Sequence, residues 1–162
     1  MNTSLVMYEE EFEVIKHLLN SLRMDASAKI VFLVDKNGQQ IAEAGEVNLI
    51  DTTSLASLTA GNVAATDGLA KLIGEKEFSI LFHEGRKDNI HISIVAQRLI
   101  LVVIFDERSS LGLVRLRVRK ASADLERVLY EMEAKSLEAG SVKTVSPFAE
   151  ITDDDIDALF SE

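Results

Sequence analysis

Hydrophobic residues along the chain recur at two spacings, and the change between them marks the predicted elements. From residue 4 to 24 they recur every three or four positions, which predicts an amphipathic helix with acidic first turns. Segments 28–34 and 40–44 are rich in β-forming residues. They flank Asn37-Gly38, which favours a hairpin because both turn positions tolerate φ > 0. The first part of the chain therefore predicts a helix followed by a β-hairpin.

The middle of the chain predicts a second helix and three strands. A helical pattern follows Asp51, a good N-cap residue, and ends at Gly74. Segments 78–83, 89–95 and 99–105 are predicted to be strands. The last of them is apolar throughout, as expected of a strand that is covered on both faces.

The segment 111–132 allows two interpretations. Residues 114–119 alternate with period two, which taken alone indicates a strand. However, a helical stripe of apolar residues continues to Met132, and Ser109 or Ser110 can cap a helix here. We therefore predict a helix.

The resulting order is α-β-β-α-β-β-β-α, with short antiparallel connections. It predicts an α+β fold class, in which helices sandwich a five-stranded antiparallel sheet. Residues 1–136 are predicted to form one domain and 137–147 a linker. Residues 148–162 are predicted to be an acidic C-terminal tail with a short amphipathic helix.

Charge excludes several classes of partner. The 162 residues contain 17 basic and 27 acidic side chains, a net charge of −10. This balance argues against nucleic acid and anionic membranes as partners, since both bind through clustered basic charge. Ten acids lie near the two ends, and without them the chain has 17 acids against 17 bases. These ten are Glu9, Glu10, Glu11, Glu13, Glu150, Asp153, Asp154, Asp155, Asp157 and Glu162.

The location expected from the sequence is cytoplasmic. The chain has no cysteine, which removes disulfides and thiolate chemistry. Its longest apolar run, 99–105, has seven residues, whereas a membrane-spanning helix needs about 20. The N-terminal residues lack the basic start of a signal peptide.

Motifs for catalysis or cofactor binding are sparse. His17, His83 and His91 are predicted on a helix face, at a strand end and on the exposed face of strand 89–95. No G-x-S-x-G turn, metal-ligand spacing or phosphate-binding glycine motif accompanies them. We therefore expect no catalytic residue, no metal and no cofactor.

Two charged runs leave alternatives open. The aspartates of 153–157 could attract calcium weakly, but they lack the glycine and closing glutamate of an EF-hand loop, and N-cap side chains are favoured. The second run contains Arg115, Arg117, Arg119 and Lys120. It allows a phosphate or acidic partner, but the solvated face of an amphipathic helix is favoured.

The second helix carries the most informative pattern. One side is large and apolar, and we predict that it packs on the sheet: Leu55, Leu58, Leu69, Leu72 and Ile73. Beside it lies a stripe of small residues, namely Ser57, Gly61, Ala64, Ala65 and Gly68. Each glycine in a helix interior costs about 1 kcal/mol relative to alanine, so close approach of another element should compensate. That element can be the sheet, or it can be a helix from a second protomer or from another protein. A helix from outside this chain's own fold is favoured over the sheet, which indicates a protein that binds proteins.

Several segments resemble the roadblock/dynein light chain family. They are IDTTSLASLTAGNVAATDGLAKLIGE, FHEG and LVVIFDERSSLGLVRLRVRKAS. Within the family the chain is similar to members from gliding myxobacteria that act on a small Ras-like GTPase, through LVMYEEEF, VFLVDKNGQ and SPFAEITDDDIDALFSE. The resemblance covers nearly the whole chain and is weakest in 128–145.

The resemblance implies a roadblock-like sandwich that forms a homodimer. Strand 78–83 would pair with its copy and extend the sheet, with the two second helices side by side. The interface residues implied in this way are Gly61, Leu72, Phe78, Ile80 and Phe82.

The resemblance also implies the function. One dimer would bind one GTPase in its GTP form and stimulate GTP hydrolysis, in control of cell polarity and gliding motility, with enrichment at a cell pole. The GTPase supplies the chemistry, so the chain is not expected to be an enzyme. Similar proteins reposition the catalytic residues of the GTPase. Arg86 and Arg108 are therefore interpreted as solvated loop residues rather than arginine fingers.

Helical geometry then suggests the contacts with the GTPase. The predicted set is Ala60, Ala64, Asp67, Gly68 and Lys71, on the side turned away from Leu58 and Leu69. The tail offers a second contact through Phe148, Ile156, Leu159 and Phe160, and a disordered solubilising tail is the alternative. The competing functional class is a scaffold that binds a GTPase without changing its rate.

Overall fold

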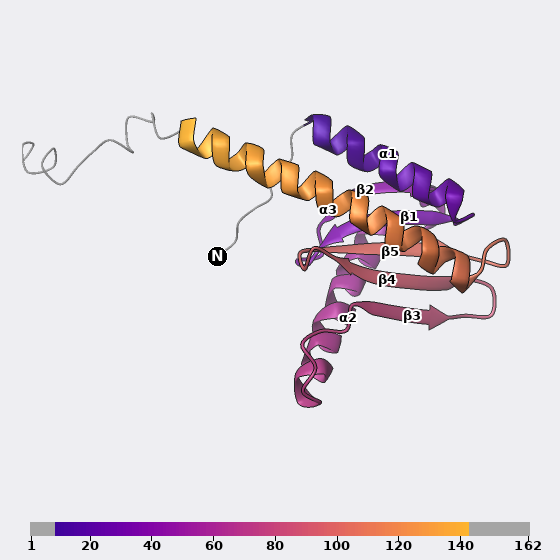
Figure 1. Cartoon of the computed structure of the whole chain (residues 1–162). Helices are drawn as coiled ribbons and strands as arrows, with labels where there is room; N and C mark the ends of the chain where they lie inside the picture. Colours follow the sequence, from indigo (N-terminus) through magenta and orange to yellow (C-terminus); the bar gives the residue numbers. More distant parts are fainter. Residues whose placement is uncertain (1–8, 143–162) are drawn as a thin grey trace, which may run out of the picture.

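The computed structural model describes residues 9–142, with side chains through Glu138 (Figure 1). Its elements follow the predicted order, and the α+β class is confirmed. They are α1 Glu9–Asp25, β1 Ile30–Asp35, β2 Gln40–Gly45, a 3-10 turn η1 Val47–Leu49, α2 Thr52–Leu72, β3 Ile80–Glu84, β4 Asn89–Val95, β5 Leu99–Phe105 and α3 Leu111–Val142.

The five strands form one antiparallel sheet in the order β2-β1-β5-β4-β3. Helices α1 and α3 cover one face and α2 crosses the other, running on beyond β3 (Figure 1). Strand β5 is at the centre and is buried at every position, as its apolar sequence predicts. Strand β3 is at one edge, and among the described residues its outer side has no partner strand.

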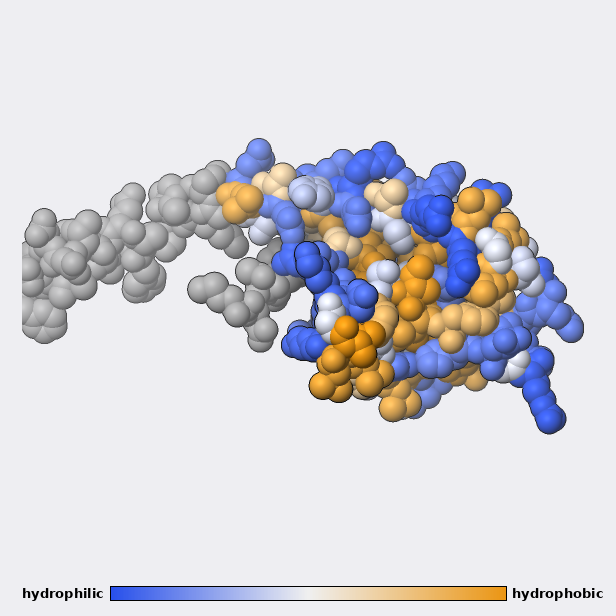
Figure 2. All heavy atoms as spheres, turned by 60° about the horizontal axis from the view of Figure 1, so that its bottom comes forward, coloured by the Kyte–Doolittle hydropathy of each residue, from blue (hydrophilic) through white to orange (hydrophobic). Residues whose placement is uncertain are grey.

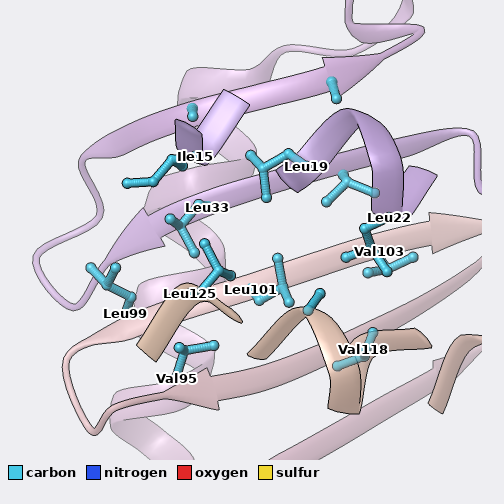
Figure 3. Packing of buried hydrophobic residues seen from close by; sticks show 14 of the residues in the cluster. Ile15, Leu19, Leu22, Leu33, Val95, Leu99, Leu101, Val103, Val118 and Leu125 are labelled. Atoms are coloured by element: carbon cyan, nitrogen blue, oxygen red, sulfur yellow. The ribbon is translucent and has the colours of Figure 1, made fainter. Parts of the chain in front are cut away.

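The core has two layers, one on each face of the sheet. On the face of α1 and α3, Ile15 and Leu19 of α1 and Leu125 of α3 point toward Leu33 and Leu101 of the sheet (Figure 3). All five side chains are fully buried. This layer holds both helices against the strands and leaves α2 to pack alone on the opposite face.

The predicted hairpin turn between β1 and β2 is confirmed. One carboxylate oxygen of Asp35 accepts hydrogen bonds from the backbone amides of Asn37 and Gln39, each at 2.9 Å. Gly38 has φ +90°, a conformation that side chains with a Cβ rarely adopt. A Cβ there would lie 3.2 Å from the Cα of Ser57, so the turn also packs closely against α2.

Helix α2 shows the largest departure from the sequence prediction. Its entry is as predicted, because the Asp51 carboxylate accepts from the Ser54 amide at 3.1 Å. The buried face, however, consists mainly of small residues: Ala56, Thr59, Ala60, Val63, Thr66 and Ala70. The prediction that five large apolar residues pack on the sheet holds for Leu55, which is half-buried against this core layer. It was wrong for the other four, which are exposed: Leu58, Leu69, Leu72 and Ile73.

The sheet itself explains this orientation. The strand face under α2 carries large side chains, among them Phe32, Ile92 and Ile100. A helix with small residues on its inner face fits against such a surface without a void or a clash. Most of the larger apolar side chains of this segment are consequently turned outward, namely Leu58, Leu69, Leu72 and Ile73.

Two boundaries differ from the prediction. Strand β3 begins at Ile80, so Phe78 precedes it. Helix α3 continues to Val142, so the first residues of the predicted linker 137–147 are helical. The remainder of that linker and the predicted tail 148–162, with Phe148, Ile156, Leu159 and Phe160, lie outside the described residues.

Candidate functional site

The outward side of α2 is an apolar surface that the sheet does not cover. Three leucines on it are largely exposed, Leu58 by 72%, Leu69 by 60% and Leu72 by 84%. Small residues lie between them along the helix. We call this set the α2 outer face: Leu58, Gly61, Ala65, Gly68, Leu69 and Leu72. Exposed leucines interleaved with glycine and alanine are typical of a helix surface that packs closely on another protein.

The free edge of the sheet, at β3, lies beside this surface. Ile80 is 49% exposed, and Phe82 is half-buried and stacks on Phe105 with ring centroids 6.2 Å apart. Figure 2 shows apolar residues gathered on the face turned forward from the bottom of Figure 1, within a more hydrophilic surround. A free strand edge and an uncovered apolar helix therefore belong to the same side of the molecule.

One hydrogen bond joins these two elements. The side-chain amide nitrogen of Asn62 on α2 lies 2.9 Å from Nε2 of His83 on β3. His83 is exposed, as predicted, and it acts here as a link between the helix and the edge strand. The link fixes the end of β3 relative to the middle of α2.

The predicted GTPase contacts are only partly exposed. Ala64, Gly68 and Lys71 are exposed and Asp67 is half-buried. Ala60 is buried and packs in the core layer between α2 and the sheet. Ala60 is thus unable to touch a partner while α2 stays in place, because the prediction had the helix facing the wrong way.

The residues predicted for the dimer interface lie on the α2 outer face, on the edge strand β3 and, for Phe78, just before that strand. Gly61 and Leu72 are exposed, and a Cβ added to Gly61 would meet no atom within 4 Å. Ile80 is exposed, while Phe78 and Phe82 are half-buried. The tertiary structure therefore brings together residues from two elements that are separate in the sequence.

The two loop arginines differ in their surroundings. Nε of Arg108 lies 3.0 Å from the Asp106 carboxylate. This hydrogen bond lowers the pKa of the Asp106 carboxyl and raises that of the Arg108 guanidinium. Arg86 is exposed in the loop between β3 and β4. Arg108 is therefore held by its own loop, whereas Arg86 is open to solvent.

The prediction for His91 was wrong. Its side chain is fully buried rather than exposed, because α3 covers that face of β4. Burial and the charge of Arg115 lower the pKa of the imidazole. The alternation of polar and apolar residues in β4 suggested a solvated face, and the helix that covers it comes later in the chain, after β5.

The described residues offer no metal centre and no membrane-spanning helix. No group of three or more histidine, aspartate or glutamate side chains in residues 9–138 is placed to hold a metal ion. Among the helices that the structure describes, none has the length and apolar character needed to cross a membrane.

The fold and this surface define a member of the roadblock/LC7 family. A family model for the roadblock/LC7 domain matches residues 14–105, and the chain belongs to that family. The sequence resemblance noted above is thereby confirmed. A comparison with curated proteins gave no significant match.

Comparison with solved structures shows which members of the family this chain resembles. The chain is 62% identical to Myxococcus xanthus MglB, with a TM-score of 0.75 over 79% of this chain and 96% of that one. It is 32% identical to the gliding protein MglB from Thermus thermophilus, with a TM-score of 0.74 over 81% and 99%. An MglB with a tetrameric arrangement is 30% identical, with a TM-score of 0.75 over 82% and 99%.

Proposed function

We propose that the protein is a homodimeric regulator of a small Ras-like GTPase of the MglA type, whose GTP form it binds and whose GTP hydrolysis it stimulates. The observation that carries this proposal is the α2 outer face, an uncovered apolar surface beside a free strand edge. The similarity to MglB supports the proposal that the GTPase is of the MglA type.

Two features support the proposed homodimer. An unpaired edge strand exposes backbone donors and acceptors that a second copy can satisfy, and β3 is such an edge among the described residues. Leu72 and Ile80 are exposed and apolar, and burial of such groups on association is favourable. Pairing of β3 with its copy would extend the sheet and bring the two α2 helices together. Self-association also has a precedent in the MglB with a tetrameric arrangement.

The paired α2 helices then form the docking surface for the GTPase. Ala64 and Gly68 allow close approach because neither has a bulky side chain, and Lys71 adds a charged group at the margin. Asp67 is half-buried beside them. One GTPase would span both helices, so one dimer binds one GTPase. The GTPase contributes the catalytic residues, and this chain contributes their positioning.

Release of phosphate from GTP-loaded MglA, with and without this protein, tests the proposal. We expect stimulation above the intrinsic rate, and we expect Gly68→Arg to abolish both binding and stimulation. A Cβ at this position meets no neighbouring atom within 4 Å, so the fold should survive. Ala123→Arg, at an exposed position of α3, is the matched control and should leave stimulation unchanged. Normal binding and stimulation by Gly68→Arg would contradict the placement.

The same assay separates the proposed function from its alternative. A scaffold would bind GTP-loaded MglA while phosphate release stays at the intrinsic rate. We further propose that the protein acts in the cytoplasm near a cell pole and so controls polarity and gliding. Fluorescence microscopy of a tagged copy in a gliding bacterium tests the location, and a uniform signal would contradict it.

We also propose that the acidic residues 148–162 make a second contact with the GTPase. Their sequence combines Ile156 and Leu159 with several aspartates. Deletion of 146–162, followed by measurement of both nucleotide exchange and hydrolysis on MglA, tests this contact. A truncated protein that behaves as the full chain in both assays would overturn it. A division of the chain at residue 147 is part of the same proposal, whereas the predicted division at residue 136 is not, because α3 continues to Val142.

A further inference from the structure

A cavity of about 370 Å³ lies on the opposite side of the sheet from α2, between strands β3 and β4 and helix α3. It belongs neither to the α2 outer face nor to the residues proposed to contact the GTPase. Its volume is in the range of small-molecule sites. The polar residues that line it are Ser79, His91, Ser93, Arg115, Arg119 and Ser122.

Two buried polar side chains in this cavity have no hydrogen-bond partner in the described part of the chain. They are His91, at both ring nitrogens, and Ser93, at its hydroxyl oxygen. His91 is fully buried and Ser93 nearly so. Leaving a buried donor or acceptor unsatisfied costs about 1–3 kcal/mol, so groups like these normally have a partner. Both side chains line the cavity, where a bound molecule can supply that partner.

The electrostatics of the cavity favour a negative charge. Arg115 and Arg119 lie one helical turn apart on α3 and both line it. Neither guanidinium forms an ion pair with a carboxylate of the described residues, and the lining described for the cavity contains no acidic side chain. Two arginines beside neutral donors are a common arrangement for binding an oxyanion.

We infer that this cavity binds a small molecule through an oxyanion, either a phosphate or a carboxylate group. Arg115 and Arg119 on α3 supply the positive charge. An N–H of His91 and the hydroxyl of Ser93 donate hydrogen bonds to the anion from strand β4. Ser79 and Ser122 complete the polar lining. This site lies across the sheet from α2 and contains none of the residues proposed to contact the GTPase, although Ile80 of the proposed dimer interface also lines it.

A bound anion would directly change the electrostatic surroundings of the His91 imidazole. The pKa of this imidazole is lowered by burial first and by the Arg115 charge second. An anion between the two side chains offsets the Arg115 charge and adds a hydrogen-bond acceptor. The imidazole NMR signals of His91 should therefore report binding. His17 and His83 lie elsewhere and serve as internal references.

The test is a titration of the full chain with inorganic phosphate at fixed pH and fixed ionic strength, with acetate in a parallel experiment. We expect saturable movement of the His91 signals with at least one of the two anions, while the His17 and His83 signals stay still. Preference for phosphate or for acetate identifies the group that the site takes. No saturable movement with either anion would overturn the inference.

Two sets of variants make the result specific. Arg115→Gln and Arg119→Gln should each weaken binding about tenfold, as expected from the loss of one charge-assisted hydrogen bond. Ser93→Ala should also weaken it. Arg86→Gln removes the same charge from an exposed loop and is the matched control. Equal weakening by Arg86→Gln and the α3 variants would overturn the inference, because it would show only a response to net charge.

Discussion

The side-chain amide of Asn62 on α2 lies 2.9 Å from Nε2 of His83 on β3, so the proposed docking helix is tied to the edge strand of the sheet. Twenty-one residues separate the two side chains in the sequence. The contact joins the two elements that the proposed dimer would use.

The first prediction concerns this hydrogen bond. A double-mutant cycle with Asn62→Ala and His83→Ala should give a coupling of about 0.5–1 kcal/mol, the usual net value of one such bond. Urea unfolding at one fixed protein concentration measures it, because dimerisation would add to the stability. The pair Asn48→Ala and His83→Ala is the control. Full additivity of the Asn62 and His83 changes would contradict the contact.

The second prediction concerns the proposed dimer. Leu72→Glu and Ile80→Lys place charges on the α2 outer face and the β3 edge, where both side chains are exposed in a single chain. Each should leave folding intact and raise the dimer dissociation constant at least about tenfold, or 1.4 kcal/mol. Light scattering coupled to size-exclusion chromatography measures the mass. Leu116→Glu, on exposed α3 surface, should stay dimeric, and a dimer of unchanged affinity for both edge variants would refute the interface.

The third prediction compares two glycines. Gly68→Ala should stabilise the protein by up to about 1 kcal/mol, because the helix interior prefers alanine and the new Cβ meets no atom within 4 Å. Gly45→Ala should destabilise it by more than about 2 kcal/mol, because φ there is +102° and the Cβ would clash with the carbonyl oxygen of Lys29. Urea unfolding measures both. Loss of stability in Gly68→Ala would show that another surface approaches it closely.

The fourth prediction concerns an ion pair between α1 and α3. Glu11 is buried, and the hydrogen bond from Lys135 is the main cause that holds the pKa of its carboxyl below the ordinary value. A carboxyl of lowered pKa stabilises the fold above its unfolded-state pKa, and this contribution is lost as pH falls through the folded-state pKa. Lys135→Gln should therefore lower the urea midpoint at pH 7 and have little effect at pH 3.

The control for this pair is Lys120→Gln, an exposed lysine on the same helix. It should change the urea midpoint little at either pH. Equal losses for Lys135→Gln at pH 7 and pH 3 would show that Lys135 acts through packing of its aliphatic chain rather than through its charge.

The fifth prediction concerns the loop arginines. Arg86→Ala and Arg108→Ala should keep stimulated GTP hydrolysis within about twofold of the unchanged protein, whereas removal of an arginine finger costs about 10³–10⁵ in rate. Single-turnover phosphate release from MglA, measured at saturating protein, tests both. A collapse of the rate with binding preserved would assign that arginine a catalytic part and contradict repositioning as the mechanism.

Local sequence patterns were sufficient for the elements with strong signals. Asn37-Gly38 determined the hairpin because the turn needs a residue that accepts positive φ, and Gly38 has φ +90°. The apolar run 99–105 determined a central strand because it has no polar face to expose to water. The same reasoning left Ser109 and Ser110 as alternative caps of α3, and the structure selects Ser110, whose hydroxyl accepts from the Leu113 amide at 3.2 Å.

Local sequence patterns did not predict which side of α2 faces the sheet. Its apolar residues are spread around the helix, so periodicity gives no single inner face, and the larger leucines were assigned to the sheet. Only the bulk of Phe32, Ile92 and Ile100 on the facing strands explains why Ala56 and Ala60 turn inward. The burial of His91 has the same kind of cause, because a helix distant in sequence covers it.

The sequence by itself determined the order of helices and strands, the hairpin and the likeness to the roadblock family. These depend on periods, turn residues and motifs that act over a few neighbours. The tertiary structure alone decided which side of α2 faces outward, that Ala60 is hidden while Leu58 is exposed, and that His91 and Arg115 share a cavity. Each depends on the shape of a surface assembled from residues far apart in the chain, and a one-dimensional pattern carries no information about that shape.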